Sequence, residues 1–281
     1  MAGPYAQDVR DRHEPLPRLV LQGPRVLLAT DESDAARAAE EWMRRLRWAR
    51  MPAIDVLTIA PRPGLLAGLG LQTYRTAVRE AVIQARETEL LEAQRIANAV
   101  GSRLQQAGIR VRVWARTGDA ADEIVRMARL ENADLVVVGK SGRMSPALPW
   151  GRTVASQVAR DSNAAVLVAQ PPARHGDRLP RSIAVLDLED SATADALKWL
   201  TDIGWLLDVA GDGPSAASGL VMLPSDRDQS VDAVRALVQK REIDLAVVPR
   251  TRDRDVTSLA MRIADAARVS VLHVPATVRS H

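Results

Sequence analysis

Residues 134–153 read DLVVVGKSGRMSPALPWGRT, and this stretch decides the fold class. Its first five residues are Asp134 and four apolar residues, a short run that is typical of a strand buried on both faces of a parallel sheet. A loop that begins with Gly139 follows, and a segment with helical periodicity then runs from Thr153 to Asp161. A buried strand that leads through a glycine loop into a helix predicts an α/β domain with a ligand site at the strand's carboxyl end.

The same alternation extends to both sides of this stretch. Expected strands are 25–30, 54–59, 111–115, 134–138 and 165–169, and expected helices are 31–47, 73–106, 120–130 and 153–161. In the long helix, Leu90, Ala93, Ala97, Val100 and Leu104 recur at steps of three and four, which predicts one apolar face. Gly108 is the expected left-handed stop. The alternation predicts a doubly wound parallel sheet.

A repeat indicates a second copy of this domain. After the proline-rich residues 170–180, SIAVLDLEDSATADAL echoes RVLLATDESDAARAAE, and EIDLAVVP echoes NADLVVVG. The later stretch SLAMRIADAARVSVLHV echoes TVASQVARDSNAAVLVA without a gap, whereas 208–219 replaces the long helix. A repeat of this length indicates a duplicated domain. We therefore expect a tail at 1–22, a first domain at 23–172, a linker at 173–180 and a reduced second domain at 181–281.

Composition excludes several classes of function. The 281 residues carry a net charge of only +3, and basic and acidic residues are interleaved, so no nucleic-acid-binding stripe is expected. Cysteine is absent and the four histidines are scattered, which excludes a disulfide framework and gives no metal-ligand spacing. No apolar run approaches the roughly 20 residues of a membrane span, and the N-terminus lacks a signal-peptide core. We expect a cytoplasmic protein.

The glycine loop is the candidate site. Glycines let backbone approach a phosphate closely, and the amides at a helix N-terminus attract anions. Gly139-Lys140-Ser141 superficially looks like a P-loop, but Asp134 stands where that motif requires its first glycine, so we reject the motif.

The loop and the strand before it resemble the universal stress protein family. Nucleotide-binding members of that family carry Gly-x2-Gly-x9-Gly-Ser/Thr after the fourth strand and an Asp at the end of the first. Gly139, Gly142 and Thr153 match that pattern, and Asp31 follows the first strand. The resemblance covers about 23–170 well and 181–274 more weakly. It implies two Rossmann-like domains in tandem, paired through their last strands, with ATP or AMP bound to the first, and Mg²⁺ alongside ATP.

The resemblance also implies which residues surround the nucleotide. Asp31 and Ile54 would lie around adenine and ribose, the first two glycines by ribose and phosphate, and Arg152-Thr153 at the phosphates. The full candidate set is Thr30, Asp31, Ile54, Val138, Gly139, Gly142, Arg143, Gly151, Arg152 and Thr153. Each also has a purely structural interpretation: Asp31 and Thr153 as helix caps, the glycines as turn residues, and Arg143 as a solvated charge.

One departure from the family pattern leaves two alternatives open. Arg152 stands where the third glycine is expected, with Gly151 one place early. Its guanidinium either grips phosphate or fills the space that phosphates need. In the second copy Pro249 replaces the first glycine and RTRDRD (250–255) replaces the loop, so no nucleotide site is expected there. Asp187 echoes Asp31 there and is interpreted as a remnant.

Three functions follow in order of preference. The first is an adenine-nucleotide-binding stress-response or regulatory protein acting through an unidentified protein partner. The second is an interaction module of the same fold, with the pocket closed by Arg152. The third is an enzyme such as an ATP-dependent ligase or a hydrolase, and it comes last because no nucleophile–base pair is evident. Slow ATP hydrolysis is compatible with the first. Self-association as a homodimer is expected, with no nucleic acid or membrane as partner.

Overall fold

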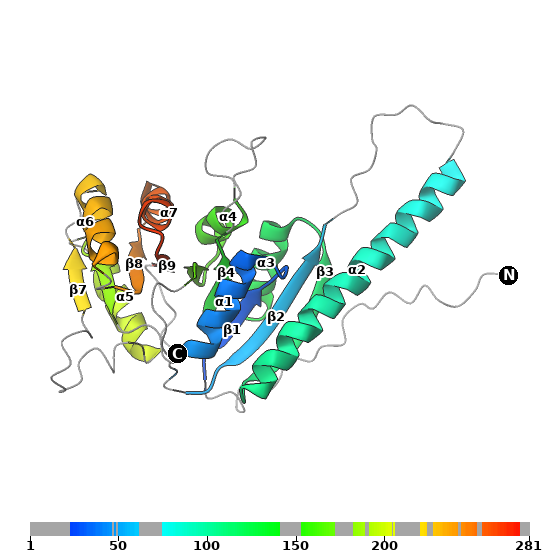
Figure 1. Ribbon diagram of the computed structural model, residues 1–281, viewed down its shortest axis with the longest axis horizontal. Helices are drawn as coiled ribbons and strands as arrows, with labels where there is room; N and C mark the ends of the chain where they lie inside the picture. Colours follow the sequence, from blue (N-terminus) through cyan, green and yellow to red (C-terminus); the bar gives the residue numbers. More distant parts are fainter. Residues whose placement is uncertain are drawn as a thin grey trace.

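The computed structural model describes residues 23–46, 48, 50–61, 75–140, 153–171, 182–188, 191–203, 205, 220–223, 227–240, 243–251 and 255–275. These residues form a sheet flanked by helices on both faces (Figure 1). The strands are β1 (Arg25–Ala29), β2 (Ala53–Ala60), β3 (Arg110–Thr117), β4 (Leu135–Gly139), β5 (Ala165–Ala169), β6 (Ile183–Leu186), β7 (Leu220–Leu223), β8 (Leu245–Arg250) and β9 (Ser270–Pro275). The helices are α1 (Asp34–Arg45), α2 (Arg75–Gln106), α3 (Ala120–Leu130), α4 (Val154–Asp161), α5 (Ser191–Asp202), α6 (Arg227–Gln239) and α7 (Asp255–Ala267).

The sheet joins the two sequence repeats end to end. Its strand order is β3-β2-β1-β4-β5-β9-β8-β6-β7. All neighbours are parallel except β5 and β9, which pair antiparallel with Val166 opposite His273. The expected adjacency of the two last strands is therefore confirmed. The fold class is confirmed as well: two doubly wound α/β units in tandem, of which the second, in its described residues, has no counterpart of β3.

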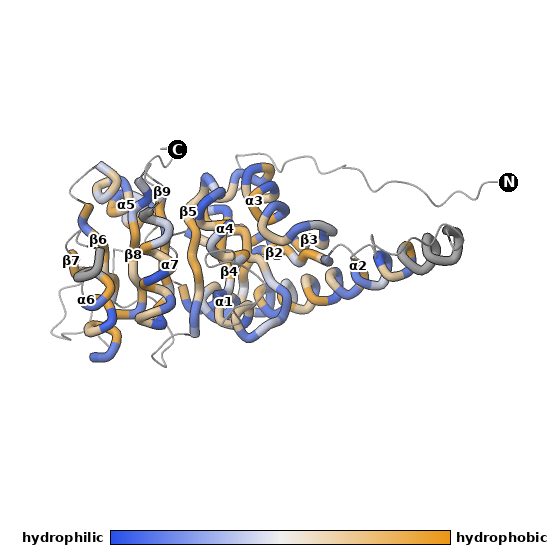
Figure 2. Tube along the Cα trace, turned by 90° about the horizontal axis from the view of Figure 1, so that it is seen from above, coloured by the Kyte–Doolittle hydropathy of each residue, from blue (hydrophilic) through white to orange (hydrophobic). Residues whose placement is uncertain are grey.

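Each face of the sheet has its own apolar core. On one face a single buried cluster runs through both halves and includes Trp42 of α1, Leu104 of α2, and Trp199 of α5. On the other face α3 and α4 cover the first half, and α6 and α7 cover the second. The apolar segments line the interior in Figure 2. The inner strands, such as β1, β4, β5 and β8, are buried on both faces and are therefore nearly continuous apolar runs, whereas the edge strands β3 and β7 are partly exposed.

Tryptophans close the junction between the halves. The rings of Trp48 and Trp205 lie 6.0 Å apart between centroids, and those of Trp199 and Trp205 lie 5.6 Å apart, both edge to face. The indole nitrogen of Trp42 donates to the carbonyl of Gln170, which follows β5. Aromatic pairs of this geometry contribute beyond their buried area. The two halves therefore share a core rather than sit on a flexible linker.

The long helix α2 corrects one expectation. Ala93, Ala97, Val100 and Leu104 are buried against β2 and β3 as predicted, but Leu90 is 40% exposed. The amino-terminal part of α2 extends past the edge of the sheet (Figures 1 and 2), so the apolar face begins at Ala93. Gly108 has the predicted left-handed conformation, with φ of +81°.

Within the described residues, no helix combines the length and the apolar character that a membrane span requires.

Candidate functional site at the carboxyl edge of β1 and β4

The switch point of the first half lies between β1 and β4. The chain passes from β1 to β2 on one side, and β4 pairs with β1 on the other. At such points the connecting loops diverge above the carboxyl ends of the strands and leave room for a ligand. The residues after β1 and at the end of β4 are therefore the first place to look for a site.

The turn after β1 presents a carboxylate. Thr30 is buried and its amide donates to the carbonyl of Leu57 at 2.9 Å, which holds the turn against β2. Asp31 is exposed, and its Oδ1 accepts a bond from the amide of Ser33 at 3.0 Å. Ser33, and not Asp31, caps α1 by accepting from the amide of Ala36 at 3.2 Å. The Asp31 carboxylate thus keeps acceptor capacity for a ligand.

A strained residue ties this turn to α2. Glu32 has φ of 58°, an uncommon conformation for a side chain of this kind. Its carboxylate pairs with Arg95 of α2 at 3.3 Å, and Arg95 also pairs with Glu92 at 2.7 Å. Hydrogen bonds to Glu92 and Glu32 raise the pKa of Arg95. The turn is positioned from two sides, by β2 below it and α2 beside it.

Gly139 has a packing role that is visible without any ligand. A Cβ at this position would lie 2.2 Å from the carbonyl carbon and oxygen of Ala35, in the first turn of α1. Val138 before it is buried. The close approach of α1 to the end of β4 therefore requires glycine at 139 and brings the two strand ends of the candidate site together.

Thr153 begins α4 at the same edge. Its hydroxyl accepts from the amide of Ser156 at 3.1 Å, while the hydroxyl of Ser156 accepts from the amide of Thr153 at 3.0 Å, a reciprocal capping box. The expected capping role is present, and the hydroxyl proton of Thr153 can still be donated to an anion. Gly142, Arg143, Gly151 and Arg152 lie outside the described residues.

Ile54 is placed at the wrong end of β2. It pairs with Val26 near the start of both strands and is buried in the core. Thr58 and Ile59, about 13–16 Å further along the strand, are the β2 residues beside the Thr30–Asp31 turn. The hydroxyl of Thr58 is buried and has no hydrogen-bond partner among the described residues. Aligning the end of β2, rather than its start, with the end of β1 would have identified both.

Among its described residues, the second half has no acid at the position that matches Asp31. Val26 of β1 pairs with Leu135 of β4, and Ile183 of β6 pairs in the same way with Leu245 of β8. Counting five residues on from each, Leu188 and not Asp187 occupies the position of Asp31. The amide of Asp187 bonds to Leu223 as that of Thr30 bonds to Leu57. The match of Asp187 to Asp31 is thus off by one residue, and the second edge carries no acid there.

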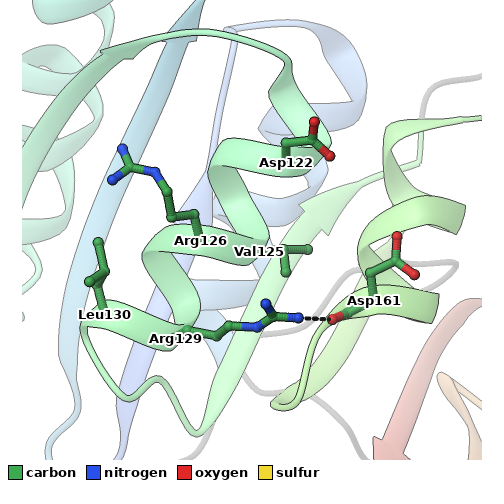
Figure 3. A pocket seen from close by; sticks show the side chains of 6 residues that line it. All are labelled: Asp122, Val125, Arg126, Arg129, Leu130 and Asp161. Carbon is green, nitrogen blue, oxygen red and sulfur yellow. Dashed lines mark hydrogen bonds between the residues drawn. The ribbon is translucent and has the colours of Figure 1, made fainter.

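An open hollow of ≈ 630 Å³ lies elsewhere, between α3 and α4 (Figure 3). It is lined by Asp122, Val125, Arg126, Arg129, Leu130 and Asp161. Arg129 donates to the backbone carbonyl of Asp161, and Arg126 points away from both carboxylates. Its polar groups do not converge on a common point, and none of the sequence-predicted site residues lines it. Among the described residues no group of three metal-ligating side chains is assembled.

Comparison with known proteins agrees with this architecture. The model of the universal stress protein family matches residues 24–170, more than half of the chain. A universal stress protein from Archaeoglobus fulgidus has a similar structure, with a TM-score of 0.60 at 16% identity, over 89% of this chain and 96% of that one. That likeness extends over both halves. No curated protein matches the chain.

Two further solved structures are similar over about half of the chain. One is a universal stress protein family protein from Arabidopsis thaliana with AMP bound, 18% identical, covering 53% of this chain and 93% of that one, with a TM-score of 0.36. The other is a universal stress protein in complex with cAMP, 23% identical, covering 53% of this chain and 98% of that one, with a TM-score of 0.34. From the family match and the doubly wound architecture together, the chain belongs to the universal stress protein family.

Proposed function

We propose that the first half binds an adenine nucleotide, AMP or ATP, at the carboxyl edge of β1 and β4, and that the chain acts as a stress-response or regulatory protein. One observation carries the proposal: the turn that presents Asp31 and the end of β4 at Gly139 adjoin at the switch point of a doubly wound sheet, and α4 begins after Thr153 at the carboxyl edge of the same sheet. A helix N-terminus favours anions such as phosphate, and family membership supports the nucleotide class.

The described residues fit a nucleotide in three respects. Asp31 keeps acceptor capacity that suits ribose hydroxyls, and the Thr153 hydroxyl keeps a proton for a phosphate oxygen. Thr58 has a buried hydroxyl in need of a partner at the same edge. A buried polar group without a partner costs stability, so a ligand that satisfies it gains affinity. We assign no reaction to the chain, and Mg²⁺ would accompany ATP through its phosphates.

The alternative is an interaction module of the same fold with the pocket closed by Arg152. The observation in its favour is the arginine itself, which stands at the position of the family's third glycine. Under this alternative the wild-type chain binds neither AMP nor ATP, and dimerisation is its activity.

Isothermal titration with AMP, ATP and adenosine tests the proposal. Wild type should bind AMP or ATP, and Asp31→Ala should weaken both by about ten- to a hundredfold through loss of charge-assisted hydrogen bonds. The matched control is Asp202→Ala, which removes an exposed acid from α5 in the second half and should leave affinity unchanged. Equal affinity of wild type and Asp31→Ala would place the nucleotide elsewhere.

A further inference from the structure

Lys140 connects the candidate site to the second half. It follows Gly139 at the end of β4, and its amide donates to the carbonyl of Ala169 at 2.9 Å. Its ammonium group forms an ion pair with the carboxylate of Asp265, which belongs to α7. The cation that directly follows Gly139 of the candidate site is thus paired with an acid from the second half.

Arg250 holds the matching place in the second half. The repeat aligns Pro249-Arg250 with Gly139-Lys140, and both pairs end a strand next to the junction. The guanidinium of Arg250 donates to the backbone carbonyls of Arg160 and Ser162, where α4 ends. Each half therefore extends a cation from the end of its penultimate strand to the last helix of the other half.

The contact of Lys140 can be broken more easily than that of Arg250. The acceptors of Arg250 are carbonyls at a helix C-terminus, which cannot be withdrawn without unwinding α4. The acceptor of Lys140 is a single carboxylate whose side chain is 68% exposed, whereas the side chain of Lys140 itself is 16% exposed. Ion pairs with one solvated partner contribute little net stability. Lys140 can therefore exchange Asp265 for another anion.

We propose that Asp265 regulates phosphate binding in the first half by competing for Lys140. The inference rests on the proposed function, because the competing anion is the phosphate of a nucleotide at the β1–β4 edge. When a phosphate takes the ammonium group, the contact between Lys140 and α7 is released. Linkage is reciprocal, so whatever draws Asp265 away from the junction strengthens nucleotide binding.

Titration of four proteins tests this regulation: wild type, Asp265→Asn, Lys140→Gln and the double variant. Asp265→Asn should tighten ATP by about two- to fivefold, the worth of an exposed ion pair, and leave adenosine unchanged. Lys140→Gln should weaken ATP and abolish the effect of Asp265→Asn in the double variant. Asp232→Asn, which removes an exposed acid from α6, controls for the general loss of negative charge.

The outcomes separate the regulation from the proposed function. Suppose that wild type binds ATP but Asp265→Asn does not change its affinity, or changes it equally for adenosine. The regulation is then wrong and the nucleotide site stands. The same conclusion follows if the effect persists without Lys140 or is matched by Asp232→Asn. If no variant binds a nucleotide, both are wrong. Binding of ATP by Asp265→Asn and not by wild type would support both, with the ion pair as the element that closes the site.

Discussion

Val166 of β5 lies directly opposite His273 of β9 in the antiparallel pair that joins the two halves. This places an ionisable ring inside the sheet, 1% exposed. The ring Nδ1 lies 3.0 Å from the carbonyl of Val248, and Nε2 lies 3.2 Å from the hydroxyl of Thr257. Because a carbonyl only accepts, Nδ1 carries the proton and Nε2 accepts from the hydroxyl. Both nitrogens of the neutral ring are therefore satisfied.

Acid should weaken the fold through His273. Its pKa is lowered from 6.5 to about 4, mainly by burial; the bond to Val248 opposes this shift and the nearby charge of Arg250 adds to it. Between about pH 6.5 and pH 4, His273 is mostly protonated in the unfolded chain and mostly neutral in the folded chain. The neutral His273 ring therefore contributes its full share to the free energy of unfolding above pH 6.5. This share, up to about 3 kcal/mol, is lost as the pH falls towards 4. Urea unfolding at about pH 7.5 and about pH 5 measures the loss.

The variant His273→Gln, which cannot titrate at this position, is the control for this pH dependence. In His273→Gln the drop in unfolding free energy between the two pH values should shrink by the share of one titrating group. An identical drop in wild type and variant would show that other groups, and not His273, govern the acid sensitivity.

The junction could be predicted because the repeat supplies two similar last strands and the family resemblance implies that such strands pair. Two copies of one strand–helix pattern, with apolar last strands, leave two sheet edges that can pair. The error at Ile54 comes from placing the start of β2, rather than its end, beside the end of β1; the bond from Thr30 to Leu57 shows the actual register. The contact between Lys140 and Asp265 could not be foreseen either, since it depends on how the halves dock.

Gly139→Ala should destabilise the chain even without nucleotide. A methyl group there would meet the backbone of Ala35 at 2.2 Å, so the start of α1 must move. Overpacking of this kind costs about 1–3 kcal/mol. Urea unfolding should show the loss, whereas Gly108→Asn should change little, because Gly108 has open space around it and asparagine tolerates its left-handed backbone. Unchanged stability with lost nucleotide binding would instead assign Gly139 a role in ligand contact alone.

Arg112→Ala should be more damaging than Arg126→Ala. The guanidinium makes two bonds of 2.7 Å to Asp55, which is buried and also accepts from the indole of Trp114. Removing one partner of such a pair leaves a buried charge uncompensated, a cost of about 3 kcal/mol. Arg126→Ala, which breaks the surface pair with Glu123, should cost about 0.5 kcal/mol.

A double variant tests the cause of the Arg112 effect. In Asp55→Asn the buried group is neutral, so adding Arg112→Ala should cost clearly less than it does in wild type. Full additivity of the two substitutions in urea unfolding would mean that Arg112 acts through its stem or through its ion pair with Glu131, and not through its charge on Asp55.

Self-association of the tandem chain remains a prediction. Pairing of β5 with β9 within the chain already uses the edge through which single-domain relatives are expected to dimerise, so any homodimer must form through another surface. We expect weak association, seen as a mass above 30.5 kDa that rises with concentration in light scattering. A constant monomer mass at high micromolar concentration would exclude the homodimer.

Arg152 decides between the two functions, and a substitution series tests its role directly. If the guanidinium grips phosphate, Arg152→Ala removes a charge-assisted contact and should weaken ATP by about ten- to a hundredfold while weakening adenosine far less. If the side chain fills the phosphate position, Arg152→Gly restores the family pattern and should create or strengthen ATP binding. The neighbouring Gly151 lets the loop adjust around a long side chain, which favours the gripping role. Titrations of ATP and adenosine into wild type, Arg152→Ala and Arg152→Gly give opposite orders of affinity for the two roles, so tighter ATP binding by both variants would establish the closed pocket instead.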